Sequence, residues 1–193
     1  MPFNTELFFQ IFSLGQKFPF LDNLMVFTAQ YLIYFVIASI FILAIKGGVK
    51  EKKALLVIIL SLIFAEIIIK IFHLFYVEPR PFVTYNLEPL IKHLPDASFP
   101  SEHTTAMATV AFSYYFYRSK WTLLFLILMV SVGFARIFVG VHYPLDIVGG
   151  IALGFISVSL VWLLKSWLKT KIFNSYPHQP HQRSSDEARL LTV

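Results

Sequence analysis

Three short groups of polar residues interrupt a mostly apolar chain, and they contain the residue types that phosphoryl transfer uses. The groups are Glu-Pro-Arg-Pro at 78–81, Pro-Ser-Glu-His at 100–103, and a third in which Arg136 is followed by His142 and Asp146. Histidine acts as a nucleophile or as a general acid and base, and arginine binds phosphate oxygens through a planar fork. The three groups therefore indicate transfer of a phosphoryl group through a phosphohistidine.

His142 and Asp146 stand one helical turn apart, a spacing that suits a nucleophile and the residue that orients it. A neutral imidazole nitrogen attacks phosphorus, while the carboxylate holds the other ring nitrogen and fixes the tautomer. His103 is expected to protonate the departing phosphate and later to activate water. The structural alternative makes Asp146 only the cap of the last helix, which leaves Arg136 and the 100–103 group without a role.

Arg80 and Arg136 are predicted to bind the nonbridging phosphate oxygens and to balance the charge that develops in the transition state. Ser101 and backbone N–H groups at the start of the following helix would add donors, in a field that favours anions. Arg80 also fits an anchor at a membrane interface. Because the arginines supply positive charge, and no Asp, Glu and His set has ligand spacing, we expect neither a metal nor another cofactor.

The composition indicates that this site is held in a membrane. Hydrophobic residues make up 57% of the 193 residues, charged residues make up 14%, and the mean hydropathy is +0.69. A soluble domain would carry roughly 25% charged residues. The net charge of +5 is spread among hydrophobic runs, which favours membrane orientation over nucleic-acid binding. The chain has no cysteine, so disulfides and thiol chemistry are excluded.

Five apolar stretches predict an all-α fold, an integral membrane bundle of about five transmembrane helices. The stretches are Leu24–Ile45, Ala54–Val77, Thr104–Tyr117, Trp121–Val141 and Leu145–Leu168. The third stretch reaches about 27 Å only if its helix begins at Pro100–Ser101.

Both ends of the chain are predicted to differ from this bundle. Residues Phe3–Phe20 mix aromatic and polar side chains and predict a helix in the membrane interface, ended by Pro19; a sixth crossing is the alternative. The first 20 residues do not resemble a cleavable signal peptide. We expect one membrane domain over 1–175 and a polar, disordered cytoplasmic tail over 176–193.

The basic residues predict the orientation of the bundle. Of the 16 lysines and arginines, four lie in the loop at 46–53, two at 118–120 and five from 165 onward, all on one side of the predicted bundle. The other side has few bases, and two of them belong to the polar groups. The positive-inside tendency then puts the C-terminus in the cytoplasm and the three polar groups at the outer face of the membrane.

The polar groups resemble the motifs of the type 2 phosphatidic acid phosphatase superfamily, in its membrane branch. That pattern is a lysine separated by six residues from Arg-Pro, then Pro-Ser-Gly-His, then Ser-Arg followed after five residues by His and after three more by Asp. The match runs from Lys70 to Asp146, and the fixed spacing of the third motif makes it specific. With Glu-Pro-Arg-Pro-Phe at 78–82, the chain is most similar to the undecaprenyl-diphosphate phosphatases of the bacitracin-resistance type.

The first departure from the family pattern concerns its lysine. His73 stands at that position, and Lys70 lies one turn deeper on roughly the same face. Either Lys70 reaches the site by snorkelling, or His73 takes its role, or the role is lost. Lys70 also follows Glu66 by four residues, so an ion pair within the helix is a structural alternative.

The second departure is Glu102, which replaces the usual glycine. A carboxylate repels a phosphate, so we expect the Glu102 side chain to point away, to be protonated, or to pair with a base. A third change, Ala135 in place of serine, should matter least.

The resemblance implies a bacterial cell-membrane enzyme that hydrolyses undecaprenyl diphosphate to undecaprenyl phosphate at the outer face, recycling the carrier lipid for cell-wall polymers. A broader lipid phosphatase, acting on phosphatidylglycerophosphate or phosphatidate, is the alternative. A lipid transporter could instead use Glu66, Lys70 and Arg136 along a path, but the chain has few spans and no internal repeat. The expected partners are the lipid substrate and the bilayer, and no nucleic acid.

Overall fold

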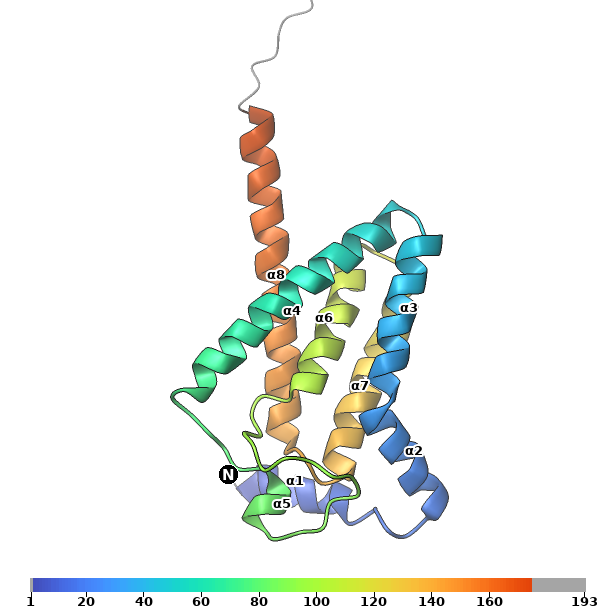
Figure 1. Ribbon diagram of the computed structural model, residues 1–193, viewed down its shortest axis with the longest axis vertical. Helices are drawn as coiled ribbons and strands as arrows, with labels where there is room; N and C mark the ends of the chain where they lie inside the picture. The colour runs from blue at the N-terminus through green and yellow to red at the C-terminus, as the bar shows by residue number, and fades with distance from the viewer. Residues whose placement is uncertain (1, 175–193) are drawn as a thin grey trace, which may run out of the picture. The chain divides into compact units, whose positions relative to one another are not determined.

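The computed structural model describes residues 2–174, which form eight helices and no strand (Figure 1). The all-α fold class is therefore confirmed, and each of the five predicted apolar stretches is helical. The predicted tail, 176–193, lies outside the described residues. The helices are α1 (Pro2–Phe12), α2 (Pro19–Gln30), α3 (Leu32–Lys46), α4 (Val49–His73), α5 (Pro81–Thr84), α6 (Glu102–Phe116), α7 (Thr122–Phe138) and α8 (Pro144–Asn174).

The chain divides into two compact units, Met1–Val161 and Trp162–Val193, and the division falls within α8. The first unit contains the helical bundle and all three polar groups. The described part of the second unit is the C-terminal end of α8. The predicted domain boundary between 175 and 176 stays a prediction.

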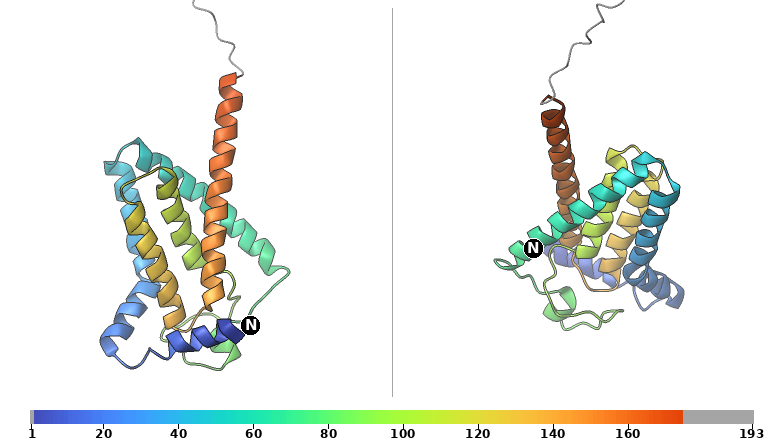
Figure 2. Two further views of the ribbon diagram at one scale, coloured as in Figure 1. Left: turned by 180° about the vertical axis from the view of Figure 1, so that it is seen from behind. Right: turned by 45° about the horizontal axis from the view of Figure 1, so that its top comes forward.

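Helix α6 forms the centre of the first unit. It packs between α4 and α7, while α3 packs on α4 and α2 packs on α7 (Figures 1 and 2). Most of its small side chains and Tyr114 are buried, and the centroid of the Tyr114 ring lies 4.6 Å from that of the Phe125 ring of α7. Threonine can be buried here because the hydroxyls of Thr105 and Thr109 donate to the carbonyls of Ser101 and Thr105 within the helix.

The start of α8 lies very close to α6. A Cβ atom at Gly154 would lie 2.6 Å from the Cβ of Ala108 and 2.9 Å from the Thr105 carbonyl oxygen, so this contact requires glycine. Small residues at helix contacts let two backbones approach in this way. The N-terminal ends of α6 and α8, which carry two of the polar groups, are thereby held side by side.

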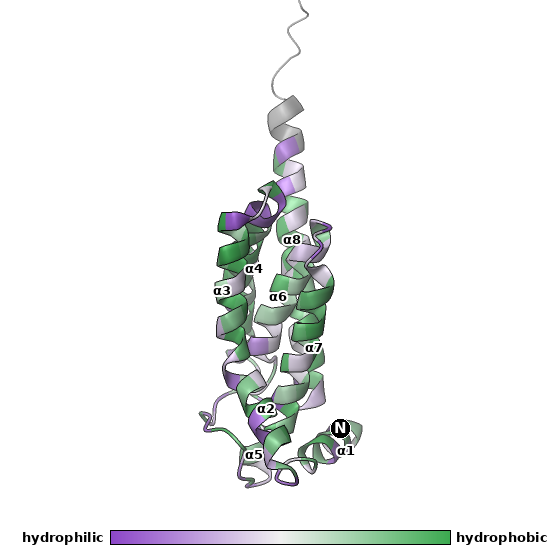
Figure 3. Ribbon diagram, turned by 90° about the vertical axis from the view of Figure 1, so that its right-hand side faces the viewer, coloured by the Kyte–Doolittle hydropathy of each residue, from purple (hydrophilic) through white to green (hydrophobic). Residues whose placement is uncertain are grey.

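The lengths of the helices explain how the bundle crosses a membrane. Among the described residues, α4 and the segment Pro144–Lys169 of α8 are long and apolar enough to span, and α2 with α3 qualifies as a bent pair. Helix α7 is apolar but has 17 residues, and α6 has 15. Many apolar side chains are exposed, for example Phe35 and Ile127. The middle of the bundle is mostly hydrophobic, and hydrophilic residues gather toward its two ends, where they are mixed with hydrophobic ones (Figure 3). Such exposure suits a lipid environment.

Two details of the N-terminal region differ from the sequence prediction. Pro19 does not end a helix over Phe3–Phe20; α1 ends at Phe12, and Pro19 is in the first turn of α2, where its missing N–H costs nothing. The first predicted span is broken at Tyr31, where α2 and α3 meet at 50°. Helix α1 lies across the ends of α7 and α8, with Phe8 fully buried (Figure 1).

Candidate active site

Arg80 and its neighbours are positioned by two short segments that pair with each other. An antiparallel bridge joins Pro79 to Ala97, and the Ser98 N–H donates to the Glu78 carbonyl at 2.8 Å. Arg80 then begins α5, is 4% exposed, and donates from Nε to Asp96 at 2.6 Å. The pairing therefore fixes the first polar group at the end of the bundle that also holds the starts of α6 and α8 (Figure 1).

His142 lies in the turn between α7 and α8, and Asp146 lies in the first turn of α8. Gly140 makes this turn possible, because its φ of +90° belongs to the left-handed region. His142 Nδ1 is 3.2 Å from Asp146 Oδ2, and both residues are almost completely buried. The same carboxylate oxygen accepts from the Tyr143 N–H at 2.8 Å and from the Ser98 hydroxyl at 2.5 Å. Three donors therefore hold the carboxylate that orients the imidazole.

Both arginines face the other nitrogen of His142. Nη1 of Arg80 lies 2.9 Å from His142 Nε2, and Nη2 of Arg136 lies 3.4 Å from it. Arg80 Nη1 is also 3.3 Å from Nδ1, but its shorter contact is with Nε2, and Nδ1 faces the Asp146 carboxylate, which only accepts. These contacts assign a neutral His142 with its proton on Nδ1 and its lone pair on Nε2. Burial, followed by the charges of Arg136 and Arg80, keeps the pKa of His142 well below its ordinary value. The nitrogen that would attack phosphorus is thus unprotonated and surrounded by phosphate-binding groups.

Arg136 is buried and contacts groups from several parts of the chain. It is 2% exposed, Nη1 donates to the Ala29 carbonyl at 3.4 Å, and Nη2 lies 3.0 Å from His93 Nε2. The Ala29 carbonyl is available because α2 ends at the bend, where helix carbonyls lose their intrahelical partners. Arg136 Nε is buried and has no hydrogen-bond partner within the described part of the chain. A buried, charged donor of this kind suits an anionic ligand.

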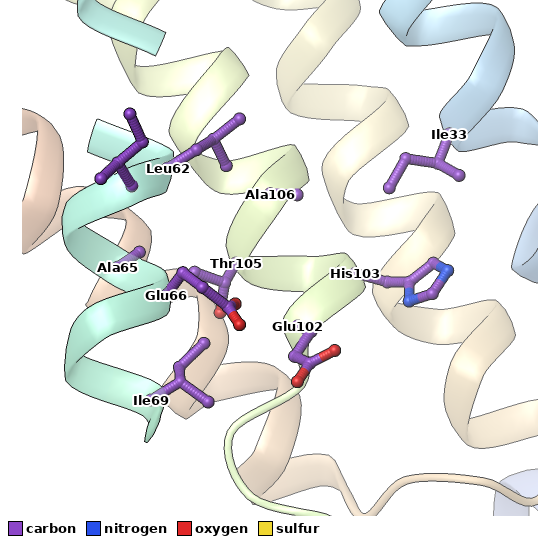
Figure 4. Close-up of a pocket in the computed structure, with 10 residues that line it drawn as sticks. Ile33, Leu62, Ala65, Glu66, Ile69, Glu102, His103, Thr105 and Ala106 are labelled. Atoms are coloured by element: carbon purple, nitrogen blue, oxygen red, sulfur yellow. The ribbon is translucent and has the colours of Figure 1, made fainter. Parts of the chain in front are cut away.

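His103 lies in the first turn of α6 and is shared by two cavities. One, of about 260 Å³, also contains Arg136 and His93. The other is a groove of about 460 Å³ between α4 and α6, and Figure 4 shows the His103 imidazole pointing away from the α4 wall of this groove. The side chain predicted as general acid therefore stands between the arginine cluster and an apolar groove.

Ser101 is buried and begins α6. Its hydroxyl oxygen accepts from the Thr104 N–H at 3.4 Å and from the Thr104 hydroxyl at 3.1 Å, and its own N–H donates to the Asp146 carbonyl at 3.1 Å. The side chain is thus the N-cap of the helix, and the backbone bond ties α6 to α8. Its predicted role as a phosphate ligand stays a prediction.

The three accessory candidates occupy separate places. Lys70 Nζ pairs with Glu66 at 3.4 Å on an exposed face of α4, which is the structural alternative stated from the sequence. His73 Nε2 lies 2.9 Å from the Phe99 carbonyl, so it supports the segment that leads into α6. Glu102 is exposed and projects with Glu66 into the α4–α6 groove (Figure 4). Arg80, a base at the same end of the bundle, is paired with Asp96 and not with Glu102.

Three residues at the site carry no sequence motif: His93, Asp96 and Ser98. All three lie in the segment between α5 and α6, which has no helical period. His93 Nδ1 lies 3.1 Å from the Leu94 carbonyl and Nε2 faces Arg136, which fixes a neutral tautomer. Burial lowers the pKa of His93. Their contacts arise only after this segment folds over the ends of the helices, so no local signal could identify them.

We expect Ser98→Ala to lower kcat by about tenfold, because a hydrogen bond to a charged group contributes roughly 1.5–3 kcal/mol. The hydroxyl touches only the carboxylate that orients His142, so KM should change little. Steady-state kinetics in detergent would measure both constants. Ser131→Ala is the matched control, since that hydroxyl donates only within α7. Equal kcat values for the two variants would exclude a positioning role for Ser98.

Among residues 2–174, no group of three or more His, Cys, Asp or Glu side chains is arranged to hold a metal ion. The positive charges that face His142 are those of the two arginines. The prediction that no metal is needed is therefore open to a direct test.

Comparison with protein families finds one match, the PAP2 superfamily, over residues 54–170, which is more than half of the chain. The three polar groups all fall within this range.

Named relatives extend the match to nearly the whole chain. The "Bacitracin transport permease protein BcrC" of Bacillus licheniformis is 32% identical over 91% of this chain and 84% of its own length. The "Undecaprenyl-diphosphatase BcrC" of Bacillus subtilis is 35% identical over 79% of each chain. Among solved structures, Aquifex aeolicus LpxE superposes with a TM-score of 0.69 at 25% identity, covering 81% of this chain and 93% of that one.

Proposed function

Because the chain belongs to the PAP2 superfamily and is a membrane lipid phosphatase, we propose that it hydrolyses undecaprenyl diphosphate to undecaprenyl phosphate and inorganic phosphate. The observation that carries the proposal is the neutral His142, whose Nε2 faces Arg80 and Arg136 while Asp146 holds Nδ1. The substrate is taken from the Bacillus subtilis relative and from the undecaprenyl-diphosphatase of Sulfolobus acidocaldarius, at 30% identity.

The reaction proceeds in two steps. Burial and the charge of Arg136 lower the pKa of His103 to about 3 in the free protein, so His103 takes up its proton when the anionic substrate binds. His142 Nε2 attacks the terminal phosphorus, the bond from that phosphorus to the bridging oxygen breaks, and His103 gives this proton to the departing lipid phosphate. Arg80 and Arg136 bind the nonbridging oxygens of the transferred group. In the second step His103 takes a proton from water, the hydroxide attacks the phosphohistidine, and inorganic phosphate leaves with His142 restored.

A transporter is the competing class, and the name of the Bacillus licheniformis relative includes the word permease. A transport path requires polar groups along the interior of a bundle. Here Arg80, Arg136, His103, His142 and Asp146 gather at one end, and Lys70 pairs with Glu66 on an exposed surface. This distribution supports hydrolysis.

We expect purified protein in detergent to release phosphate from undecaprenyl diphosphate at the same rate with and without a chelator, because the arginines supply the positive charge. Phosphatidate and phosphatidylglycerophosphate in the same assay measure the breadth of the substrate range. Loss of activity on chelation, restored by a divalent cation, would contradict a metal-free mechanism. Higher kcat/KM for the monophosphates would favour the broader lipid phosphatase.

The site is proposed to face the outside of a bacterial cell membrane. Lys50 and Lys53 lie in the first two turns of α4, and the start of α4 is at the end of the bundle opposite to the start of α8 (Figure 1), which supports this orientation through the positive-inside tendency. A fluorescent reporter that matures only in the cytoplasm should be active when fused after Val193. Activity of a fused periplasm-dependent phosphatase reporter would contradict the orientation.

A further inference from the structure

A polar cavity of about 260 Å³ opens beside the reacting groups, where α2 meets α3. Its walls include Gln30, Tyr31 and Tyr34 from the two helices at the bend and Lys92 from the segment between α5 and α6. His103 and Arg136 also line it, so the cavity, here named the bend cavity, is continuous with the candidate active site. The transfer step described above uses neither Lys92 nor the tyrosines.

We propose that the bend cavity binds the second phosphate of a diphosphate, the one that remains on the lipid, and that Lys92 and Tyr34 make the enzyme selective for diphosphates. The inference rests on the proposed function. It assigns to this chain a second phosphate subsite beside the one formed by Arg80 and Arg136.

The position of His103 carries the first step of the argument. In the transfer step His103 protonates the bridging oxygen, and the second phosphorus is bonded directly to that oxygen. The second phosphate must therefore lie adjacent to His103. Among the residues that the structure describes, the bend cavity and the α4–α6 groove both touch this side chain, so both are candidates for the second phosphate.

Charge decides between the two cavities. The α4–α6 groove is lined by apolar side chains and by the carboxylates of Glu66 and Glu102, which repel a phosphate (Figure 4). The bend cavity is lined by Lys92 and Arg136, which carry positive charge, and by tyrosine and glutamine residues whose side chains can donate hydrogen bonds. An anion is therefore favoured in the bend cavity.

The break between α2 and α3 gives the cavity its wall. The two helices diverge by 50° at Tyr31, and the Ala29 carbonyl at the end of α2 is bonded to Arg136. Tyr34 lies in the first turn of α3, directly after the bend, and its ring is 65% exposed, so its hydroxyl is free to turn toward a ligand. A break in a hydrophobic helix costs free energy because backbone groups lose their intrahelical partners. Here the break lines a polar cavity.

The test compares probes with one and two phosphates. Methylenediphosphonate, which has a non-hydrolysable bridge, and inorganic phosphate are used as competitive inhibitors of lipid diphosphate hydrolysis. Lys92→Gln should weaken inhibition by methylenediphosphonate by about tenfold, the loss expected for one charge-assisted contact, and leave inhibition by phosphate within about twofold. Tyr34→Phe should weaken it by about threefold, as expected for one neutral hydrogen bond.

Lys17→Gln is the matched control, because Lys17 is an exposed lysine of the α1–α2 connection at the same end of the bundle. If Lys92→Gln weakens inhibition by both compounds equally, Lys92 contributes only general electrostatic attraction, and the proposed subsite is overturned. Unchanged inhibition by both would place the second phosphate elsewhere.

Calorimetric binding of methylenediphosphonate to the wild type and to Lys92→Gln separates this inference from the proposed function. If the wild type hydrolyses no lipid diphosphate, the proposed function alone is overturned. Binding of methylenediphosphonate that is about tenfold weaker for Lys92→Gln than for the wild type would still support the subsite. Equal binding by the two proteins would overturn the subsite, whatever the enzyme hydrolyses.

Discussion

His142→Ala should reduce phosphate release by at least about 10⁴-fold, since removal of a covalent nucleophile leaves only the binding and electrostatic contributions. The side-chain groups closest to His142 Nε2 are the guanidiniums of Arg80 and Arg136, which cannot act as nucleophiles. Rapid acid-free quenching with radiolabelled lipid diphosphate should trap a phosphorylated protein with the wild type. The label should be acid-labile and base-stable, as a phosphohistidine is, and absent from the variant.

His142 is buried, so the variant must also be shown to fold. His142→Gln fills more of the space, and both variants should extract and unfold thermally like the wild type. His103→Ala should slow transfer most for substrates with poor leaving groups, and Asp146→Asn should lose less than either histidine variant. Retention of a labelled phosphoenzyme by His142→Gln would move the nucleophile to another residue.

Arg136→Lys should lower kcat by about 10²–10³-fold, the loss typical for one group that stabilises transition-state charge. The guanidinium bonds to the Ala29 carbonyl and His93 while still facing His142 Nε2, and an ammonium cannot make these contacts at once. Kinetics with lipid diphosphate would give kcat and KM separately.

Arg118→Lys serves as the control for this substitution, because Arg118 is exposed in the α6–α7 connection at the opposite end of the bundle. Thermal unfolding of both variants separates catalytic loss from unfolding. If Arg136→Lys raises KM and leaves kcat unchanged, Arg136 binds substrate and transition state equally and has no special role in the transfer step.

Hydrophobicity and spacing predicted the helices and the polar groups, because both are local properties of the sequence. The His142–Asp146 contact follows from a spacing of four residues across a turn, and the Glu66–Lys70 pair follows from the same spacing within α4. Arg80 could be identified as a motif residue because a proline stands on either side of it. These features need no knowledge of how distant segments fold together.

The remaining features depend on tertiary packing. The break at Tyr31 occurs in a stretch without glycine or proline, so the sequence has no residue there that typically ends a helix. Asp96, Ser98 and His93 reach the site through a segment with no periodicity, and their partners lie 16 to 48 residues away. Such contacts form only when segments distant in the sequence pack together.

The contact between Asp96 and Arg80 has a consequence for turnover. Two arginines beside a phosphohistidine would hold the inorganic phosphate product tightly, and slow product departure limits many enzymes. Asp96 is half-exposed and already occupies Arg80 Nε at 2.6 Å, so a phosphate that binds this guanidinium competes with the carboxylate. We expect this competition to weaken the hold of Arg80 on the inorganic phosphate and so to favour its release.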